Sequence, residues 1–140
     1  MILFLSDVHC RYGVVNAQIA HAEARTGRPL EAVVVLGDFG FFEPDLRRFF
    51  RRQRFHRPVF VVEGNHEDFD RLPRLAETYR GAFTHLPRAT LHTIGGHRCL
   101  ALGGAAYMDA HTTPRGAVVG AADIEACLAQ IGRASCRERV

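Results

Sequence analysis

The sequence predicts an α/β fold in which βαβ units are followed by a β-hairpin. Three short apolar runs, rich in β-branched or aromatic residues, span Ile2 to Leu5, Ala32 to Leu36 and Pro58 to Val62. Runs of this length and composition are typical of strands buried on both faces of a parallel sheet. They follow one another at intervals of about 30 residues, which leaves room for the crossover helix of a βαβ unit. One domain is expected, because 140 residues can bury a real core.

Helical periodicity marks the segments between these runs. Apolar or small side chains recur at helical spacing after Gly13 and predict a first helix that ends near Thr26-Gly27. A second helix is predicted to start near Pro44-Asp45, with an apolar stripe on one face and arginines on the others. The apolar stripe consists of Leu46, Phe49 and Phe50, and the arginines are Arg47, Arg48, Arg51, Arg52 and Arg54.

Two further helices are predicted in the rest of the chain. One runs from Glu67 to Tyr79 and is interrupted at Pro73, because proline breaks the helical hydrogen-bond ladder. Its opening acids Glu67 and Asp68 are expected to cap the positive end of the helix dipole. The last helix is predicted over Ala121 to Ala129, after Gly120.

Polar side chains follow each of the three predicted strands where the strand ends. They are Asp7 and His9 after the first run, Asp38 after the second, and Asn65 and His66 after the third. In an open α/β sheet the carboxyl ends of the strands meet at one crevice, so these side chains are expected to lie together. Oxygen and imidazole ligands suit Mn²⁺, Fe²⁺ or Zn²⁺. The pattern therefore predicts a metal centre.

The order of these motifs resembles the calcineurin-like metallophosphoesterases, in particular their bacterial and phage members. The resemblance rests on Asp7-Val8-His9, Gly37-Asp38, Gly64-Asn65-His66-Glu67 and a later Gly103-Gly104-Ala105, and it extends from Ser6 to about Asp109. It implies a β-sandwich flanked by helices, of which this chain would form the amino-terminal part. It also implies hydrolysis of phosphate esters by water activated at a binuclear metal centre.

Residue roles follow from the same resemblance. Asp7 and His9 are implied as ligands of the first metal, Asp38 as the carboxylate that bridges both metals, and Asn65 as a ligand of the second. His66 is similar to the family's non-ligand histidine, which serves as proton donor or charge stabiliser beside the scissile phosphate. Two divalent ions, Mn, Fe or Zn, are the implied cofactors of the intact protein.

The family pattern also includes a further lone histidine and a Gly-His-x-His turn that this chain lacks. The nearest candidate is Gly96-His97-Arg98-Cys99, with cysteine in place of the second histidine. It lies between two runs, Thr90 to Ile94 and Arg98 to Leu102, that Gly95-Gly96 would join as a β-hairpin, so His97 is not expected to be a ligand. With these ligands missing, at most one ion is expected to bind tightly to this chain, and the chain is expected to be nearly inactive.

The last ten residues, 131–140, resemble one reading frame of a common sequencing adapter. The expected organisation is therefore a truncated phosphoesterase domain over 1–130 and a non-native tail over 131–140. The alternative for the tail is a natural basic segment exposed to solvent.

Composition gives few clues to a partner or a compartment. The net charge of +3 falls to about +1 without the tail, which gives little support to a nucleic-acid partner. All basic residues are arginine, which fits a GC-rich bacterium. No signal peptide or membrane span is recognisable, so a cytoplasmic location without membrane attachment is expected. The cysteines have no CxxC spacing and are expected to be free thiols.

A second class of function stays open at this point. The cleft and the basic stretch Arg47–Arg57 could form a non-catalytic module that binds phosphate or nucleic acid. The plainer interpretation of that stretch is a solvated helix surface. The sequence leaves the substrate, the choice between monoester and diester, and the oligomeric state undefined.

Overall fold

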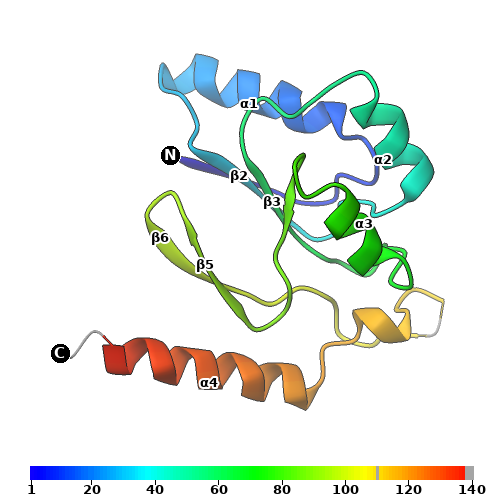
Figure 1. Ribbon diagram of the computed structural model, residues 1–140, viewed down its shortest axis with the longest axis vertical. Coiled ribbons are helices and arrows are strands. Elements are labelled where there is room, and N and C mark those ends of the chain that lie inside the picture. Colours follow the sequence, from blue (N-terminus) through cyan, green and yellow to red (C-terminus); the bar gives the residue numbers. More distant parts are fainter. Residues whose placement is uncertain (110, 138–140) are drawn as a thin grey trace.

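Four parallel strands form the central sheet, in the order β1-β2-β3-β4 (Figure 1). The structure is a computed structural model that describes the backbone of residues 1–109 and 111–137 and the side chains of these ranges up to residue 131. The strands are β1 (Ile2–Leu5), β2 (Ala32–Leu36), β3 (Val59–Val62) and the very short β4 (Thr84–His85). The three predicted strands are thus confirmed, with β3 starting one residue later than expected.

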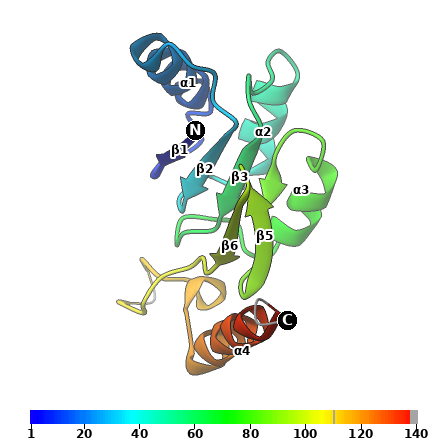
Figure 2. The same ribbon diagram turned by 90° about the vertical axis from the view of Figure 1, so that its left-hand side faces the viewer.

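A helix follows each of the first three strands. These are α1 (Gly13–Thr26), α2 (Glu43–Phe50) and α3 (Leu72–Thr78), and all three lie on one side of the sheet (Figure 2). Because crossovers between parallel strands are right-handed, a sheet whose strands follow in sequence order receives all its helices on the same face. The chain therefore has one thickly covered face and a second face that other elements must cover.

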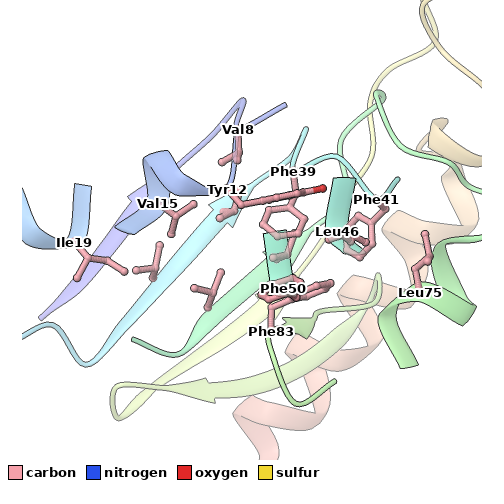
Figure 3. Close-up of a cluster of buried hydrophobic side chains, with 14 of the residues drawn as sticks. Val8, Tyr12, Val15, Ile19, Phe39, Phe41, Leu46, Phe50, Leu75 and Phe83 are labelled. Atoms are coloured by element: carbon pink, nitrogen blue, oxygen red, sulfur yellow. The ribbon is translucent and has the colours of Figure 1, made fainter. Parts of the chain in front are cut away.

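The helix-covered face holds the larger core. Alternate residues of β2 and β3, among them Val33, Val35 and Val61, point toward the helices and are fully buried. Beside them lies an aromatic cluster in which the rings of Phe39 and Phe83 are 5.0 Å apart (Figure 3). The other aromatic members are Tyr12, Phe41, Phe49, Phe50, Phe55 and Tyr79. Phe39 directly follows the predicted ligand Asp38, so the loop that carries this carboxylate is anchored in the core.

The opposite face is covered by an antiparallel hairpin of β5 (Thr90–Ile94) and β6 (His97–Ala101). This confirms the predicted hairpin. Its turn residues Gly95 and Gly96 have φ values of 53° and 78°, the left-handed region that tight hairpin turns require.

The hairpin covers this face only in part. Phe4 on the edge strand β1 is 57% exposed and Leu36 at the end of β2 is 52% exposed. The prediction that the first run is buried on both faces is therefore wrong for β1, because an edge strand next to the short hairpin lacks cover on one side.

The two later helices differ from their predicted bounds. Helix α3 begins at Leu72 and not at Glu67, and Pro73 stands in its first turn, where its missing N–H costs nothing, so it starts the helix and does not interrupt it. Helix α4 (Ala121–Arg137) lies beside β5 and continues well past Ala129, because the single glycine at position 132 weakens a helix by only about 1 kcal/mol without ending it. Residues 138–140 of the predicted tail lie outside the described residues.

Two shorter observations complete the fold. A 3₁₀ turn, η1 (Arg115–Ala117), precedes α4. Within the part of the chain that the structure describes, none of the helices combines the length and apolar character needed to cross a bilayer.

Candidate metal centre

The loops after β1 and β2 continue the pairing of their strands past the strand ends. The backbone N–H of Asp7 donates to the carbonyl of Gly37 (3.2 Å), that of His9 to Asp38 (2.8 Å), and that of Cys10 to Phe39 (3.1 Å). These bonds hold the Asp-x-His turn directly against the Gly-Asp turn. The convergence of strand ends that the sequence predicts is therefore present for the first two motifs.

Both loops contain backbone conformations that L-residues rarely adopt. Asp7, His9, Cys10 and Asp38 have φ values of 56°, 45°, 63° and 51°, in the left-handed region. Such conformations cost on the order of 1–3 kcal/mol each for residues other than glycine, and they persist where the surrounding structure holds them. Three of the four are predicted metal ligands, so the strain is concentrated at the candidate site.

His9, Asp38 and His66 form a compact group of donors. One ligand atom from each of the three side chains lies within 4.8 Å of the others. The Oδ2 atom of Asp38 is 2.9 Å from Nδ1 of His66 and 3.7 Å from Nε2 of His9. A carboxylate between two imidazoles at these distances is a donor set that a borderline divalent ion can share.

Asp38 is held in its charged form. Its Oδ1 atom accepts hydrogen bonds from the backbone N–H groups of Asn65 (2.9 Å) and His66 (3.1 Å). Although burial of Asp38 acts to raise its pKa, these bonds and the His66 side chain outweigh burial and hold the pKa below its usual value. A deprotonated carboxylate is what metal binding requires.

Asp7 and Asn65 lie beside the group without completing it. The Oδ1 atom of Asp7 is 3.7 Å from Nε2 of His9, and the Asp7 side chain is largely exposed. The amide Nδ2 of Asn65 donates to the carbonyl of Thr112 (2.6 Å). Because that bond occupies the nitrogen end of the amide, the oxygen end of Asn65 is left free for another partner.

A cavity of about 270 Å³ lies at these strand ends. Asp7, Asp38 and Asn65 line it together with Gly37, Gly64, Gly103 and Gly104. A side chain at Gly64 would collide with the carboxylate of Asp38, and one at Gly103 would come within 2.7 Å of Glu63. The glycine of Gly-Asn-His and the first glycine of Gly-Gly-Ala are therefore needed for close approach at the cleft.

Glu67 has a role that the sequence analysis missed. Its buried carboxylate accepts hydrogen bonds from the backbone N–H groups of Phe39 (2.9 Å), Gly40 (2.9 Å) and Phe41 (2.6 Å). The prediction that Glu67 caps a helix is wrong, because α3 begins at Leu72. Glu67 fixes the loop that follows Asp38, and burial raises its pKa although these three hydrogen bonds oppose the shift. Asp68 accepts a bond from the backbone N–H of Arg71 (3.3 Å), just ahead of α3.

His97 lies apart from the cluster, as expected. His97 begins β6 next to the Gly95-Gly96 turn, and a side chain at Gly95 would contact Ile2 and Glu31 at the opposite end of the sheet. The backbone N–H groups of His111 and Thr112 donate to Oδ1 of Asp109 (2.8 and 2.9 Å), so Asp109 organises a turn.

Comparison with known proteins supports the resemblance seen in the motifs. The search among curated proteins gives no match. The sequence model for the calcineurin-like phosphoesterases matches residues 1–125, which include all three motifs and the Gly103-Gly104-Ala105 segment. This chain belongs to the calcineurin-like phosphoesterase family, whose members hydrolyse phosphate esters with divalent metal ions.

Proposed function

We propose that the cleft at the ends of β1, β2 and β3 hydrolyses a phosphomonoester or phosphodiester. The observation that carries this proposal is the convergence of His9, Asp38 and His66, whose donor atoms lie within 4.8 Å of one another; His9 and Asp38 are proposed as ligands and His66 as the proton donor. In the proposed site Asp7, His9 and Asp38 would hold a first ion, and Asp38 and Asn65 would hold a second.

The residues present fit such an ion. The donors are imidazole nitrogen and carboxylate oxygen, the Asp38 carboxyl is charged, and the glycines of the cleft leave space at the donor atoms. Mn, Fe or Zn matches this mixture better than Mg or Ca, which prefer oxygen alone. When bound, divalent ions lower the pKa of water and stabilise charge on the phosphoryl oxygens.

His66 is placed to handle a proton. Its Nδ1 faces Asp38 at 2.9 Å, and its side chain is more than half exposed. With Nδ1–H donated to the carboxylate, Nε2 is the nitrogen available to substrate, and a protonated ring can give its Nε2 proton to the leaving oxygen. The assignment of the proton to Nδ1 follows from the hydrogen-bond partner.

This chain is proposed to hold one ion tightly. Asp7, His9 and Asp38 give three protein ligands to the first position, a usual number for a catalytic ion that also keeps water. The second position receives only the shared Asp38 and Asn65 from the residues whose side chains the structure describes. If the second position were weakly occupied, one of the two ions that stabilise the attacking and leaving oxygens would be missing. Low turnover is therefore expected.

A non-catalytic phosphate-binding module is the alternative. Arg47, Arg51 and Arg54 line a surface cavity of about 420 Å³ between α2 and the segment after α3. Such a basic surface could bind a phosphate group without any chemistry. It lies on the helical side of the molecule, away from the donor group, so it accounts for none of the strained residues at the strand ends.

The test combines metal analysis with turnover of an aryl phosphate. Purified protein would be freed of metal, titrated with Mn²⁺ by calorimetry, and assayed with p-nitrophenyl phosphate and bis-p-nitrophenyl phosphate. The expected result is one tight site and slow release of product that depends on Mn²⁺.

Matched variants make the test specific. His9→Ala should abolish both tight Mn²⁺ binding and product release, whereas His21→Ala, which changes an exposed histidine on α1, should change neither. Phosphate binding without product, unaffected by His9→Ala, would replace the enzyme proposal by the binding module.

A further inference from the structure

Glu63 and Arg88 form a buried ion pair just outside the donor group. The Oε1 atom of Glu63 lies 2.8 Å from Nε of Arg88, and its Oε2 lies 2.9 Å from Nε2 of His85. The Glu63 side chain is only 7% exposed. Glu63 lines the cavity at the strand ends, and Gly64, Asn65 and His66 follow it directly in the chain. Buried charges of this kind persist only where each is fully partnered.

The remaining nitrogens of Arg88 bind a distant segment. Nη1 donates to the carbonyl of Val118 (2.9 Å), and Nη2 donates to those of Gly116 (2.9 Å) and Ala117 (2.9 Å). One planar guanidinium therefore joins the end of β3 to the η1 turn. A lysine could keep the charge beside Glu63, but it could not reproduce this fork of donors.

The described residues between Gly104 and Val118 belong to a loop whose two ends are held at Glu63 and at Arg88. At one end the N–H of Gly104 donates to the carbonyl of Glu63 (2.6 Å). At the other, Arg88 holds the η1 carbonyls, and the ends are joined where the N–H of Ala105 donates to Ala117 (2.8 Å). The backbone of Glu63 and the guanidinium of Arg88 thus hold the two ends of the loop, and the ion pair joins these two anchors.

The same loop touches the candidate ligands. The Thr112 carbonyl accepts the Nδ2 hydrogen bond of Asn65 (2.6 Å), and a side chain at Gly116 would come within 2.7 Å of Phe69. The turn that carries Asn65 and His66 is therefore held between the Glu63–Arg88 pair on one side and the anchored loop on the other. The backbone N–H groups of this turn donate to Asp38, so a shift of the ion pair would also change the orientation of the Asp38 carboxylate.

We infer that Arg88 is a positioning residue for the metal centre. Arg88 contacts no proposed ligand. It holds the loop whose Thr112 carbonyl accepts the amide N–H of Asn65, which directs the amide oxygen of Asn65 away from Thr112. It also helps to fix the turn whose N–H groups donate to Asp38. This inference rests on the proposed function, because it assigns Arg88 to the same metal site. Outer partners of this kind typically change metal affinity by 10–100-fold.

The test compares Arg88→Lys with Arg74→Lys. Arg74 also pairs with a glutamate, Glu43, at 2.7 Å, but that pair is exposed and lies away from the cleft. Through the turn whose N–H groups bind Asp38, Arg88→Lys is expected to weaken the tight Mn²⁺ site by about 10-fold, and it is expected to shift the Asn65 side-chain amide signal in NMR spectra of the metal-free protein. Arg74→Lys is expected to leave both unchanged.

A second variant covers the case in which Arg88→Lys does not fold. Gly116→Ala keeps Arg88 and Glu63 and displaces the η1 turn from Phe69, so it should weaken Mn²⁺ binding in the same direction. Wild-type affinity and an unshifted Asn65 amide in the folded variants would overturn the positioning role while leaving the metal site in place. Absence of any Mn²⁺ binding by the wild-type protein would instead overturn the proposed function.

Discussion

The Oε2 atom of Glu67 lies 2.6 Å from the backbone nitrogen of Phe41 and accepts its hydrogen bond. With the bonds from Phe39 and Gly40, a single buried carboxylate fixes three consecutive peptide groups. The side chains of Phe39 and Phe41 are fully buried in the core next to them. The loop after Asp38 is thus held from both sides, by Glu67 on its backbone and by the aromatic cluster on its side chains.

Glu67→Gln should therefore destabilise the protein by about 1–3 kcal/mol, because glutamine offers one acceptor oxygen and turns an NH₂ group toward backbone donors. Urea unfolding in EDTA measures the loss. Glu77→Gln, at an exposed pair with Arg80, is the control and should change stability by no more than about 0.5 kcal/mol. Equal losses in the two variants would contradict the role given to Glu67.

Asp38→Asn should reduce Mn²⁺ affinity more than any other single change at the cleft. It removes the charge between His9 and His66 but keeps an oxygen for the two backbone N–H groups. The loss should exceed the roughly 10–100-fold typical of outer partners, as measured by calorimetry. Asp70→Asn, which changes an exposed carboxylate, should bind as the wild type does.

His66→Ala should leave metal content intact and lower turnover by about 10²–10⁴, the usual contribution of a positioned proton-transfer group. The measurement is the rate of aryl phosphate hydrolysis alongside the bound Mn²⁺ per chain. Since Nδ1 of His66 also belongs to the donor group, loss of the ion from this variant would make His66 a ligand and end its assignment as a proton donor.

Metal should stabilise the folded chain through one site. At a free Mn²⁺ concentration of 100 times its dissociation constant, the free energy of unfolding should rise by about 2.7 kcal/mol, and EDTA should reverse the increase. Two tightly bound ions per chain in metal analysis, together with steady turnover, would contradict the one-ion proposal.

Acid sensitivity should depend partly on Glu23. Arg57 donates a 2.7 Å hydrogen bond to Glu23, and the backbone N–H of Leu30 donates another at 2.7 Å. These bonds hold the pKa of Glu23 below its usual value. Because a lowered carboxyl pKa stabilises the fold above the unfolded value of about 4.3, this contribution is lost as the pH falls below it. Urea titrations at matched ionic strength would measure the free energy of unfolding from pH 5 downward. Over this range the free energy of unfolding should fall less for Glu23→Gln than for the wild type.

The candidate ligands could be predicted from sequence because they stand where strands end. Short apolar runs locate the ends, and a parallel sheet brings ends together regardless of distance along the chain. The proximity of His9, Asp38 and His66 is predicted in this way, and the three side chains do lie together. The orientation of Asn65 could not be found, since it depends on a backbone carbonyl 47 positions away.

The supporting residues were missed for a similar reason. Glu67 looks like a helix cap because acids commonly open helices, and nothing local shows that its partners are N–H groups near Asp38. Arg88 looks like any surface arginine until its three carbonyl partners are placed beside it. Tertiary hydrogen bonds of this kind leave no periodic trace in the sequence.

The sequential strand order has a consequence for biosynthesis. Each strand of the central sheet pairs with the next one in the chain, so every new βαβ unit can dock on the one already made as the polypeptide leaves the ribosome. The group of His9, Asp38 and His66 is completed later than the first βαβ unit, because His66 follows the third strand. Until then the loop that carries Asp38 lacks the hydrogen bonds from Asn65, His66 and Glu67, so the proposed ligands Asp7, His9 and Asp38 are already made but not yet held in place for metal.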